Sequence, residues 1–339
     1  MRLNRVFLPL AGLVSVLLLN SCTKPEPVAI DRLDTQLFAQ KTPAAIRAAL
    51  NQNPALTRLY FGELLSGNAS PGESAPGITA SDSLVSDLAR RFNDPELNLL
   101  HQQAQTEFSD LADLRTDLGT GFANIRKAFP DFKPPRIVTM FTGFLGPDLV
   151  ITDSLIVIGL DWFIGPGAKY RPEGAAYPGY ILRRYAKPFL APAIITAISA
   201  RYNADNKQDQ TILAEMVYYG KSYVFTKTML PDAPDSTIIG YTDRQLTETT
   251  AAQGIVWAHF IDKQLLYQTT PDLKNRYLNE RPFTAEIGPR CPGAIGRWVG
   301  WRIVSRYYDE RGKSNISELM RTGNARQVFE QSGYKGQQE

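Results

Sequence analysis

The chain has 339 residues, of which 43% are hydrophobic and 10% aromatic. This composition supplies enough apolar side chains for a substantial core and excludes an intrinsically disordered protein, so we expect a folded, water-soluble body. The formal net charge is only +3 at pH 7, and so even a balance of charges gives no indication of nucleic-acid binding.

The first 21 residues have the order of a bacterial lipoprotein signal peptide. Arg2 and Arg5 form a basic start, residues 6–19 are apolar, and the small residue Ser21 precedes Cys22. The apolar run is shorter than the roughly 18 to 20 residues that span a bilayer, so a permanent transmembrane helix is the weaker interpretation. The Leu-Asn-Ser-Cys sequence at the end of this stretch resembles a lipobox, in which the cysteine becomes the acylated amino terminus.

Cys22 is therefore the predicted lipidation site, carrying palmitate or related acyl chains. One chain binds a membrane only marginally, so two or three are expected. Residues 22–30 would form the lipidated start and the tether. We expect the folded body to lie in the periplasm, attached to either the inner or the outer membrane. The alternative is a disulfide between Cys22 and Cys291. With Cys22 acylated, we expect Cys291 to be a small, buried, unreactive residue.

We predict one globular domain over residues 31–335, with a helical part up to about residue 133. Asp31 and Asp34 are expected to start its first helix. Residues 66–83 are rich in Gly, Ser, Pro and Ala and predict a loop. The apolar periodicity predicts helices over the remaining N-terminal segments, at 43–50, 56–64, 83–92 and 97–129.

The pattern changes after residue 133 to short β-branched runs separated by Gly, Pro and Asp. These runs, at 136–144, 148–153 and 154–163, predict the strands of one small sheet. Helical periodicity returns afterwards, at 180–202, 208–228, 242–267 and 292–308, with short pieces around Leu319 and Val328. The predicted fold class is α+β and mostly helical.

The last long helix carries small residues four apart, Gly296 and Gly300, beside Trp298 and Trp301. This spacing lets another backbone approach closely. Although it is typical of membrane helix dimers, arginines run through the segment and are expensive in hydrocarbon. We therefore predict a tightly packed helix in a soluble core.

No pattern in the sequence makes a positive case for an enzyme. His101 and His259 are the only histidines and lie far apart; we expect the first to be solvated and the second to be a packed or partly exposed core histidine. Neither a nucleophile elbow nor a phosphate-binding loop is present. Among the carboxylates, Asp161 marks a strand end where ligands sometimes bind, and Asp161 or Glu215 could serve an unrecognised hydrolase.

Aromatic residues are dense between residues 161 and 185, among glycines and prolines. One interpretation is a surface that binds a partner or a small ligand. The favoured one is an irregular segment held against the sheet by its own rings. The candidate surface consists of Asp161, Trp162, Tyr170, Tyr177, Tyr180 and Tyr185.

Several blocks, read in order, resemble the gliding-motility lipoprotein GldB family of the Bacteroidetes. They extend over nearly the whole mature chain and are IDRLDTQLF, LIVIGLDWFIG, MVYYGKSYVF, IGYTDRQL, WAHFIDKQLLY, CPGAIGRWVGWRIVSRYY and a terminal SGYK. The family is similar in turn to zinc metalloproteases with a His-Glu-x-x-His helix. The corresponding segment here, APAIITAISARY, lacks both histidines and the glutamate. The metalloproteases also carry a Glu-Gly element further downstream, and in that place this chain has Tyr219 before Gly220.

The resemblance therefore implies a zincin-like scaffold without its metal site, and no cofactor. It also implies a cell-envelope component that supports gliding, is associated with type IX secretion, and acts through protein contacts instead of catalysis. The expected partners are the membrane, through Cys22, and proteins of that machinery. The alternatives are an envelope hydrolase or a receptor for a small ligand.

Overall fold

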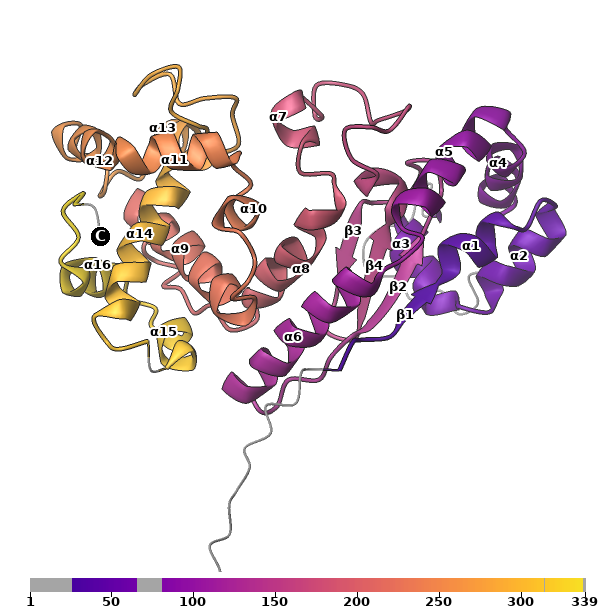
Figure 1. Cartoon of the computed structure of the whole chain (residues 1–339), viewed down its shortest axis with the longest axis horizontal. Coiled ribbons are helices and arrows are strands. Elements are labelled where there is room, and N and C mark those ends of the chain that lie inside the picture. Colours follow the sequence, from indigo (N-terminus) through magenta and orange to yellow (C-terminus); the bar gives the residue numbers. More distant parts are fainter. Residues whose placement is uncertain (1–25, 66–80, 314, 338–339) are drawn as a thin grey trace, which may run out of the picture.

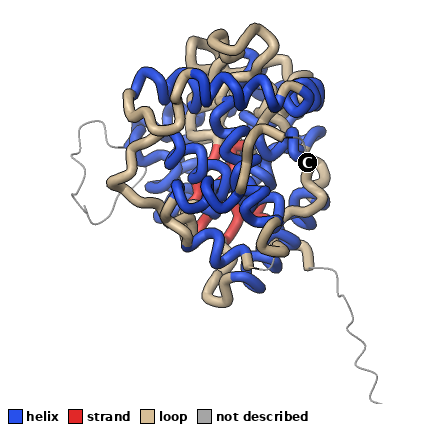
Figure 2. The backbone as a smooth tube through the Cα atoms, turned by 90° about the vertical axis from the view of Figure 1, so that its left-hand side faces the viewer, coloured by secondary structure: helices blue, strands red, loops and turns tan. Residues whose placement is uncertain are grey.

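The computed structural model describes residues 26–65, 81–313 and 315–337. Within these ranges the chain is mostly helical, with a single small sheet enclosed by helices (Figures 1 and 2). The prediction of a mostly helical α+β fold is confirmed. The predicted signal peptide, Cys22 and most of the 66–83 loop lie outside the described residues.

Helices dominate the chain before the sheet, apart from one strand. Several begin at a side-chain cap, as where Thr42 and Asp94 accept backbone N–H groups just before a proline. The elements are β1 (Ile30–Arg32), α1 (Leu33–Phe38), α2 (Pro43–Asn51), α3 (Pro54–Leu65), α4 (Asp82–Phe92), α5 (Pro95–Glu107) and α6 (Ala112–Ala128).

The four strands of the sheet lie side by side in the order β1-β2-β4-β3. The three strands that follow β1 along the chain are β2 (Arg136–Met140), β3 (Leu149–Ile151) and β4 (Leu155–Gly159). β1, β2 and β4 run parallel, and β3 pairs antiparallel with β4 at the edge. The central strands are covered on both faces, which explains their continuous apolar sequence.

The chain after the sheet is again helical. Thr211 caps the longest helix of this part, α9, and Thr242 with Gln245 forms a capping box before α11. The elements are η1 (Leu160–Phe163), α7 (Gly179–Leu182), η2 (Lys187–Phe189), α8 (Leu190–Ser199), α9 (Ile212–Met229), α10 (Asp235–Ile239), α11 (Asp243–Ala251), α12 (Gln253–Asp262), α13 (Pro271–Leu278), α14 (Ile295–Asp309), α15 (Ile316–Arg321) and α16 (Ala325–Ser332).

Helices α9 and α14 pack in direct backbone contact. A Cβ built on Gly300 would stand 1.9 Å from the carbonyl oxygen of Met216, and one on Gly220 would stand 2.3 Å from the carbonyl oxygen of Gly300. Only glycine permits this approach. The prediction that the Gly296–Gly300 helix is tightly packed in the core is confirmed, since Trp298 and Val299 are also buried.

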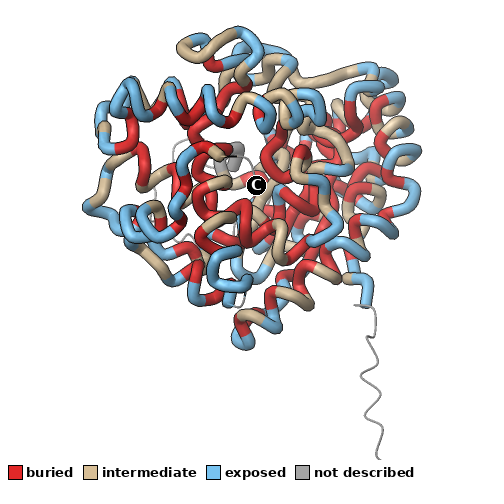
Figure 3. Tube along the Cα trace, turned by 60° about the vertical axis from the view of Figure 1, so that its left-hand side comes forward, coloured by how far each residue is buried: buried red, intermediate tan, exposed pale blue. Residues whose placement is uncertain are grey.

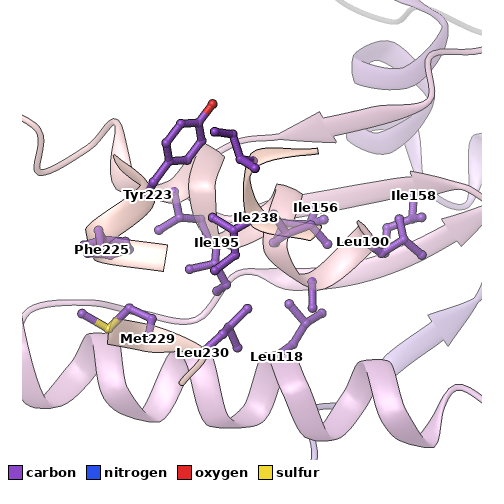
Figure 4. Packing of buried hydrophobic residues seen from close by; sticks show 14 of the residues in the cluster. Leu118, Ile156, Ile158, Leu190, Ile195, Tyr223, Phe225, Met229, Leu230 and Ile238 are labelled. Carbon is purple, nitrogen blue, oxygen red and sulfur yellow. The ribbon is translucent and has the colours of Figure 1, made fainter. Parts of the chain in front are cut away.

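One continuous apolar core joins both halves of the described chain (Figure 3). Leu118 of α6, Ile195 of α8 and Ile156 of β4 meet in it, and residues of α9 and α10 join them (Figure 4). Tyr223 of α9 stands at the border of this cluster, with its hydroxyl pointing away from the apolar side chains (Figure 4). α8 and α9 are therefore fixed to the sheet by burial on their inner faces.

Several predicted elements differ from the structure. The strand predicted over 154–163 ends at Gly159 and is followed by η1, and the helix predicted over 242–267 is divided into α11 and α12. The helix predicted over 180–202 is broken, because Ala186 is extended and forms a bridge with Ile164, and the chain restarts at η2 and α8. The first strand, β1, was missed: Asp31 lies in it instead of starting a helix, and only Asp34 lies in the first turn of α1. A three-residue strand is too short to show a period of two.

The last residues of the predicted tether lie against α6. The Val28 N–H donates to the Arg115 carbonyl oxygen at 3.2 Å, and a Cβ on Gly119 would stand 2.4 Å from the carbonyl oxygen of Glu26. The chain is thus joined to the body from about residue 26 on. No helix among the described residues is both long and apolar enough to cross a membrane.

Candidate functional site

A cleft of about 510 Å³ lies between α8, α9 and α10. We call it the α8–α9 cleft. Asp148, just before β3, reaches it from the sheet side, whereas Glu280 and Arg297 reach it from the loop after α13 and from the first turn of α14. β3 and α14 lie on opposite sides of α8 in Figure 1. The cleft therefore lies between the sheet and the helices near the end of the chain.

The α8 side of the cleft consists of small side chains. Ala193, Ala197 and Ala200 are exposed on the cleft face of the helix, and Thr196 lies among them. Their spacing of three and four residues places them on one helix face. Thr196 is already engaged, since its hydroxyl is 2.8 Å from that of Thr226 on α9. Larger residues here would fill the cleft.

Two arginines share one carboxylate on the opposite side. Arg184 contacts both oxygens of Glu280, at 3.0 Å (Nη1 to Oε1) and 2.6 Å (Nη2 to Oε2), and Arg297 Nη1 is 3.2 Å from Oε1. The Arg297 guanidinium also lies over the ring of Tyr219, 4.1 Å from its centroid. This cluster therefore carries one more positive than negative charge.

The positions of these groups follow from local backbone geometry. Gly240 ends α10 with φ of +77°, and a Cβ there would stand 2.4 Å from Cδ of Arg184. The glycine thus lets the Arg184 side chain lie against the end of α10. Tyr223 follows Tyr219 by one turn on the same face of α9, so both rings line the cleft.

A hydrogen bond separates the α8–α9 cleft from a second cavity of about 600 Å³. The Tyr185 hydroxyl donates to Asp148 Oδ2 at 2.7 Å, and both residues line both spaces. The second cavity also contacts Trp162 and Tyr177. Their rings pack around Tyr185, with centroids 5.4 Å (Trp162 to Tyr177) and 5.7 Å (Trp162 to Tyr185) apart.

The structure brings together only part of the candidate surface that the sequence indicated. Trp162, Tyr177 and Tyr185 form one aromatic cluster beside the sheet, as in the favoured interpretation. Trp162 is only 8% exposed and forms the buried part of the cluster. Tyr170 instead bonds to Glu96 on α5, and Tyr180 is half-buried in α7.

Asp161 is buried and cannot be part of an exposed surface. Its side chain is 2% exposed, and Oδ2 accepts the backbone N–H groups of Thr142 and Phe144, at 3.2 Å and 2.7 Å. Burial raises the pKa of this carboxyl to about 6, and the backbone N–H groups oppose the shift. Phe144 and Gly143 have positive φ, so Asp161 holds a tight turn after β2.

The two carboxylates considered for a hydrolase have unrelated partners. Asp161 holds the turn after β2, whereas Glu215 at the start of α9 pairs with Lys274 at 2.6 Å. Within the parts of the chain that the structure describes, no group of three His, Cys, Asp or Glu side chains is placed to hold a metal ion.

The two histidines have different environments. His259 is half-buried and lies 2.8 Å from the Tyr277 hydroxyl, as expected for a packed histidine. The expectation for His101 was wrong: its ring stacks on Phe38 with centroids 3.8 Å apart, and burial lowers its pKa to about 4. Cys291 is a half-buried free thiol, and burial raises its pKa to about 12.

Sequence reasoning missed the charged cluster of the cleft. Arg184, Glu280 and Arg297 come from three segments, and Arg184 is 96 residues from Glu280. No local spacing could indicate their contact. The sequence carried one partial signal. Arg297 lies between Gly296 and Trp298 in a helix predicted to be closely packed, and a charge in such a place requires a partner.

Comparisons with known proteins give one match. The family model described as gliding motility protein GldB matches residues 20–336, nearly the whole chain. No curated protein and no solved structure matches the chain. The match begins just before the predicted lipidation site and includes every residue of the α8–α9 cleft. The chain therefore belongs to the GldB family of gliding motility lipoproteins.

Proposed function

We propose that this protein is anchored to a cell-envelope membrane by acyl chains on Cys22 and supports gliding motility together with type IX secretion. Family membership is the observation that carries the motility assignment. The lipobox-like sequence after a basic and apolar start supports the anchor. The folded body, assigned to residues 31–335 as one domain, would then be held near the bilayer by a short link.

We further propose that the body acts by binding envelope proteins instead of by catalysis. The support is the composition of α8, where the family resemblance places a His-Glu-x-x-His sequence. The cleft face of this helix presents the methyl groups of Ala193, Ala197 and Ala200, which can neither transfer a proton nor bind a metal. A zincin-like ancestry of the scaffold remains a hypothesis consistent with this replacement.

The half-buried rings of Tyr170, Tyr177, Tyr180 and Tyr185 are the proposed contact surface for a partner protein. They lie between η1 and α8, in a segment that includes the short helix α7 and lies next to the cleft. Tyrosine combines a large apolar area with a polar tip and is frequent in interfaces. Crosslinking from this segment in solubilised membranes should identify the partner.

The anchor and the motility role can be tested together in a deletion strain. We expect deletion to abolish gliding and secretion of type IX substrates, and the wild-type gene to restore both. Cys22→Ala should leave the protein in the soluble envelope fraction and restore neither process. Cys291→Ser is the matched control, because it removes the other cysteine and should behave as wild type.

Two results would contradict the proposal. A deletion strain that glides and secretes normally would refute the role in this machinery. Cys22→Ala protein that stays in the membrane fraction after a high-salt wash would refute the lipid anchor, because a single thiol would then not determine attachment.

A further inference from the structure

The α8–α9 cleft has the dimensions and the lining of a small-molecule site. Its volume of about 510 Å³ lies within the range of roughly 300 to 1,000 Å³ that is typical of ligand pockets. Such pockets combine a mostly apolar lining with a few fixed polar groups. The cleft does so, with the α8 alanines, Phe189 and Ile238 on the apolar side and Arg184, Glu280 and Arg297 on the polar side.

The polar side carries an unbalanced positive charge in a poorly solvated place. The Arg184 and Arg297 side chains are 27% and 17% exposed, and Glu280 is the carboxylate that they share. The Nε atoms of both arginines are buried without a hydrogen-bond partner among the described residues. A guanidinium that is largely removed from water is stabilised by a second anion.

The other carboxylate of the cleft does not supply that second anion. Asp148 accepts the Tyr185 hydroxyl and the backbone N–H of Leu149, and it stands on the sheet side. Both arginines pair instead with Glu280, which follows α13. The cluster therefore keeps its excess positive charge beside an apolar surface.

Guanidinium geometry restricts the anion that fits. The Nη nitrogens of both arginines already bind one carboxylate, that of Glu280, and each of them carries a second N–H that can donate to another carboxylate. The alanine face of α8 is flat and apolar, which suits an aromatic or branched aliphatic group next to the carboxylate.

We propose that the α8–α9 cleft binds a carboxylate that carries an adjacent apolar or aromatic group, with Arg184 and Arg297 holding the carboxylate and α8 contacting the apolar group. The carboxylate has two possible sources, a free small acid or the carboxyl terminus of a peptide. This binding does not depend on the motility role, because purified protein suffices to measure it.

Calorimetric titration of the full chain in lipid nanodiscs, with empty nanodiscs as the blank, tests the site. N-acetyl-phenylalanine should bind at least tenfold more tightly than its amide, since only the acid can pair with the arginines. A tripeptide, N-acetyl-Ala-Ala-Phe, separates the sources. Binding at least as tight as that of the single amino acid indicates a peptide terminus, and much weaker binding indicates a free acid; both results support the site.

Variants assign the binding to this cleft. Arg297→Met should weaken binding of N-acetyl-phenylalanine at least tenfold. Ala197→Phe leaves every charged contact in place and fills the cleft, so it should have the same effect even if Arg297→Met fails to fold. Ala258→Phe is the matched control, because Ala258 is also an exposed alanine on a ten-residue helix. Equal binding of acid and amide, no binding at millimolar acid, or unchanged binding in Ala197→Phe would overturn the proposal.

Discussion

Gly300 of α14 lies directly against the backbone of Met216 on α9. A Cβ at Gly300 would stand 1.9 Å from the Met216 carbonyl oxygen, a distance that no side-chain rearrangement can relieve. Gly220 approaches Gly300 from the other helix in the same way. These two helices carry Tyr219, Tyr223 and Arg297, so their spacing determines the width of the α8–α9 cleft.

Gly300→Ala is therefore expected to force α9 and α14 apart. Overpacking of this kind costs about 1–3 kcal/mol or more, and here it acts on backbone. The free energy of unfolding in guanidinium chloride should fall by at least that amount. Gly254→Ala is the control, because its Cβ would have the nearest heavy atom at 3.8 Å. That variant should be as stable as wild type or slightly more stable, and equal losses in both would contradict the packing argument.

Lys221 is a buried cation that joins three segments. Its side chain is 1% exposed and donates to the carbonyl oxygens of Ala204 and Thr322, the latter at 2.8 Å, with Met320 at 3.5 Å. Burial lowers its pKa to about 8. The lysine thus joins the end of α15 to the chain that follows α8.

Lys221→Met keeps the volume and removes these bonds. The Met320 oxygen keeps the Ala204 N–H at 2.9 Å and Ala204 itself is exposed, so the main loss is the bond to the half-buried Thr322 oxygen. Leaving that carbonyl unpaired should lower the free energy of unfolding by about 1–3 kcal/mol. Lys207→Met should change it by less than about 0.5 kcal/mol, because the Lys207 side chain is 85% exposed. Should the two variants lose stability equally, the carbonyl contacts would not be responsible.

Much of the fold was predictable because its signals are local. The β-branched runs around Ile137 and Ile156 predicted strands of one small sheet, and Gly296 with Gly300 predicted a closely packed helix. His101 shows where local reasoning fails. Its neighbours Gln102 and Gln103 suggested a solvated position, but residues one and two apart face different sides of a helix, and the His101 face of α5 packs on Phe38.

The candidate site was predictable only in part, because only some of its contacts join residues that are close in the sequence. Trp162 and Tyr185 were found because they lie in one dense segment, and that segment does line a cavity. The charged cluster arises from contacts between residues far apart in the chain, which no spacing encodes. Family resemblance indicated the α8 segment but not the arginines opposite it.

Two groups whose pKa values are shifted by burial, Asp161 and the half-buried His101, should make stability depend on pH in opposite directions over one window. The pKa of Asp161 is raised by burial to about 6, so the folded state binds its proton more tightly than the unfolded state. Its contribution is fully present below about pH 4 and is lost as the pH rises through 6. The pKa of His101 is lowered by burial to about 4, so its contribution instead rises between about pH 4 and 6.5.

Asp161→Asn is expected to remove the Asp161 contribution to the pH dependence. The amide oxygen can still accept the N–H groups of Thr142 and Phe144, so the turn should persist, while the titration disappears. The free energy of unfolding relative to wild type should therefore increase between pH 4 and 7, by about 3 kcal/mol if the whole shift is realised. Chemical denaturation at several pH values measures this difference, and a difference that stays constant with pH would show that Asp161 does not titrate in this range.

His101→Phe should have the opposite sign. Phenylalanine retains the stacking on Phe38 and cannot be protonated, so the variant should gain stability relative to wild type as the pH falls from 6.5 to 4. His259→Phe is the matched control: His259 is also half-buried and its pKa is lowered too, but it donates to or accepts from Tyr277 instead of stacking on the core. Its pH effect should be smaller than that of His101→Phe. If the two variants changed equally with pH, burial against Phe38 would not make the His101 position more sensitive to pH than the His259 position.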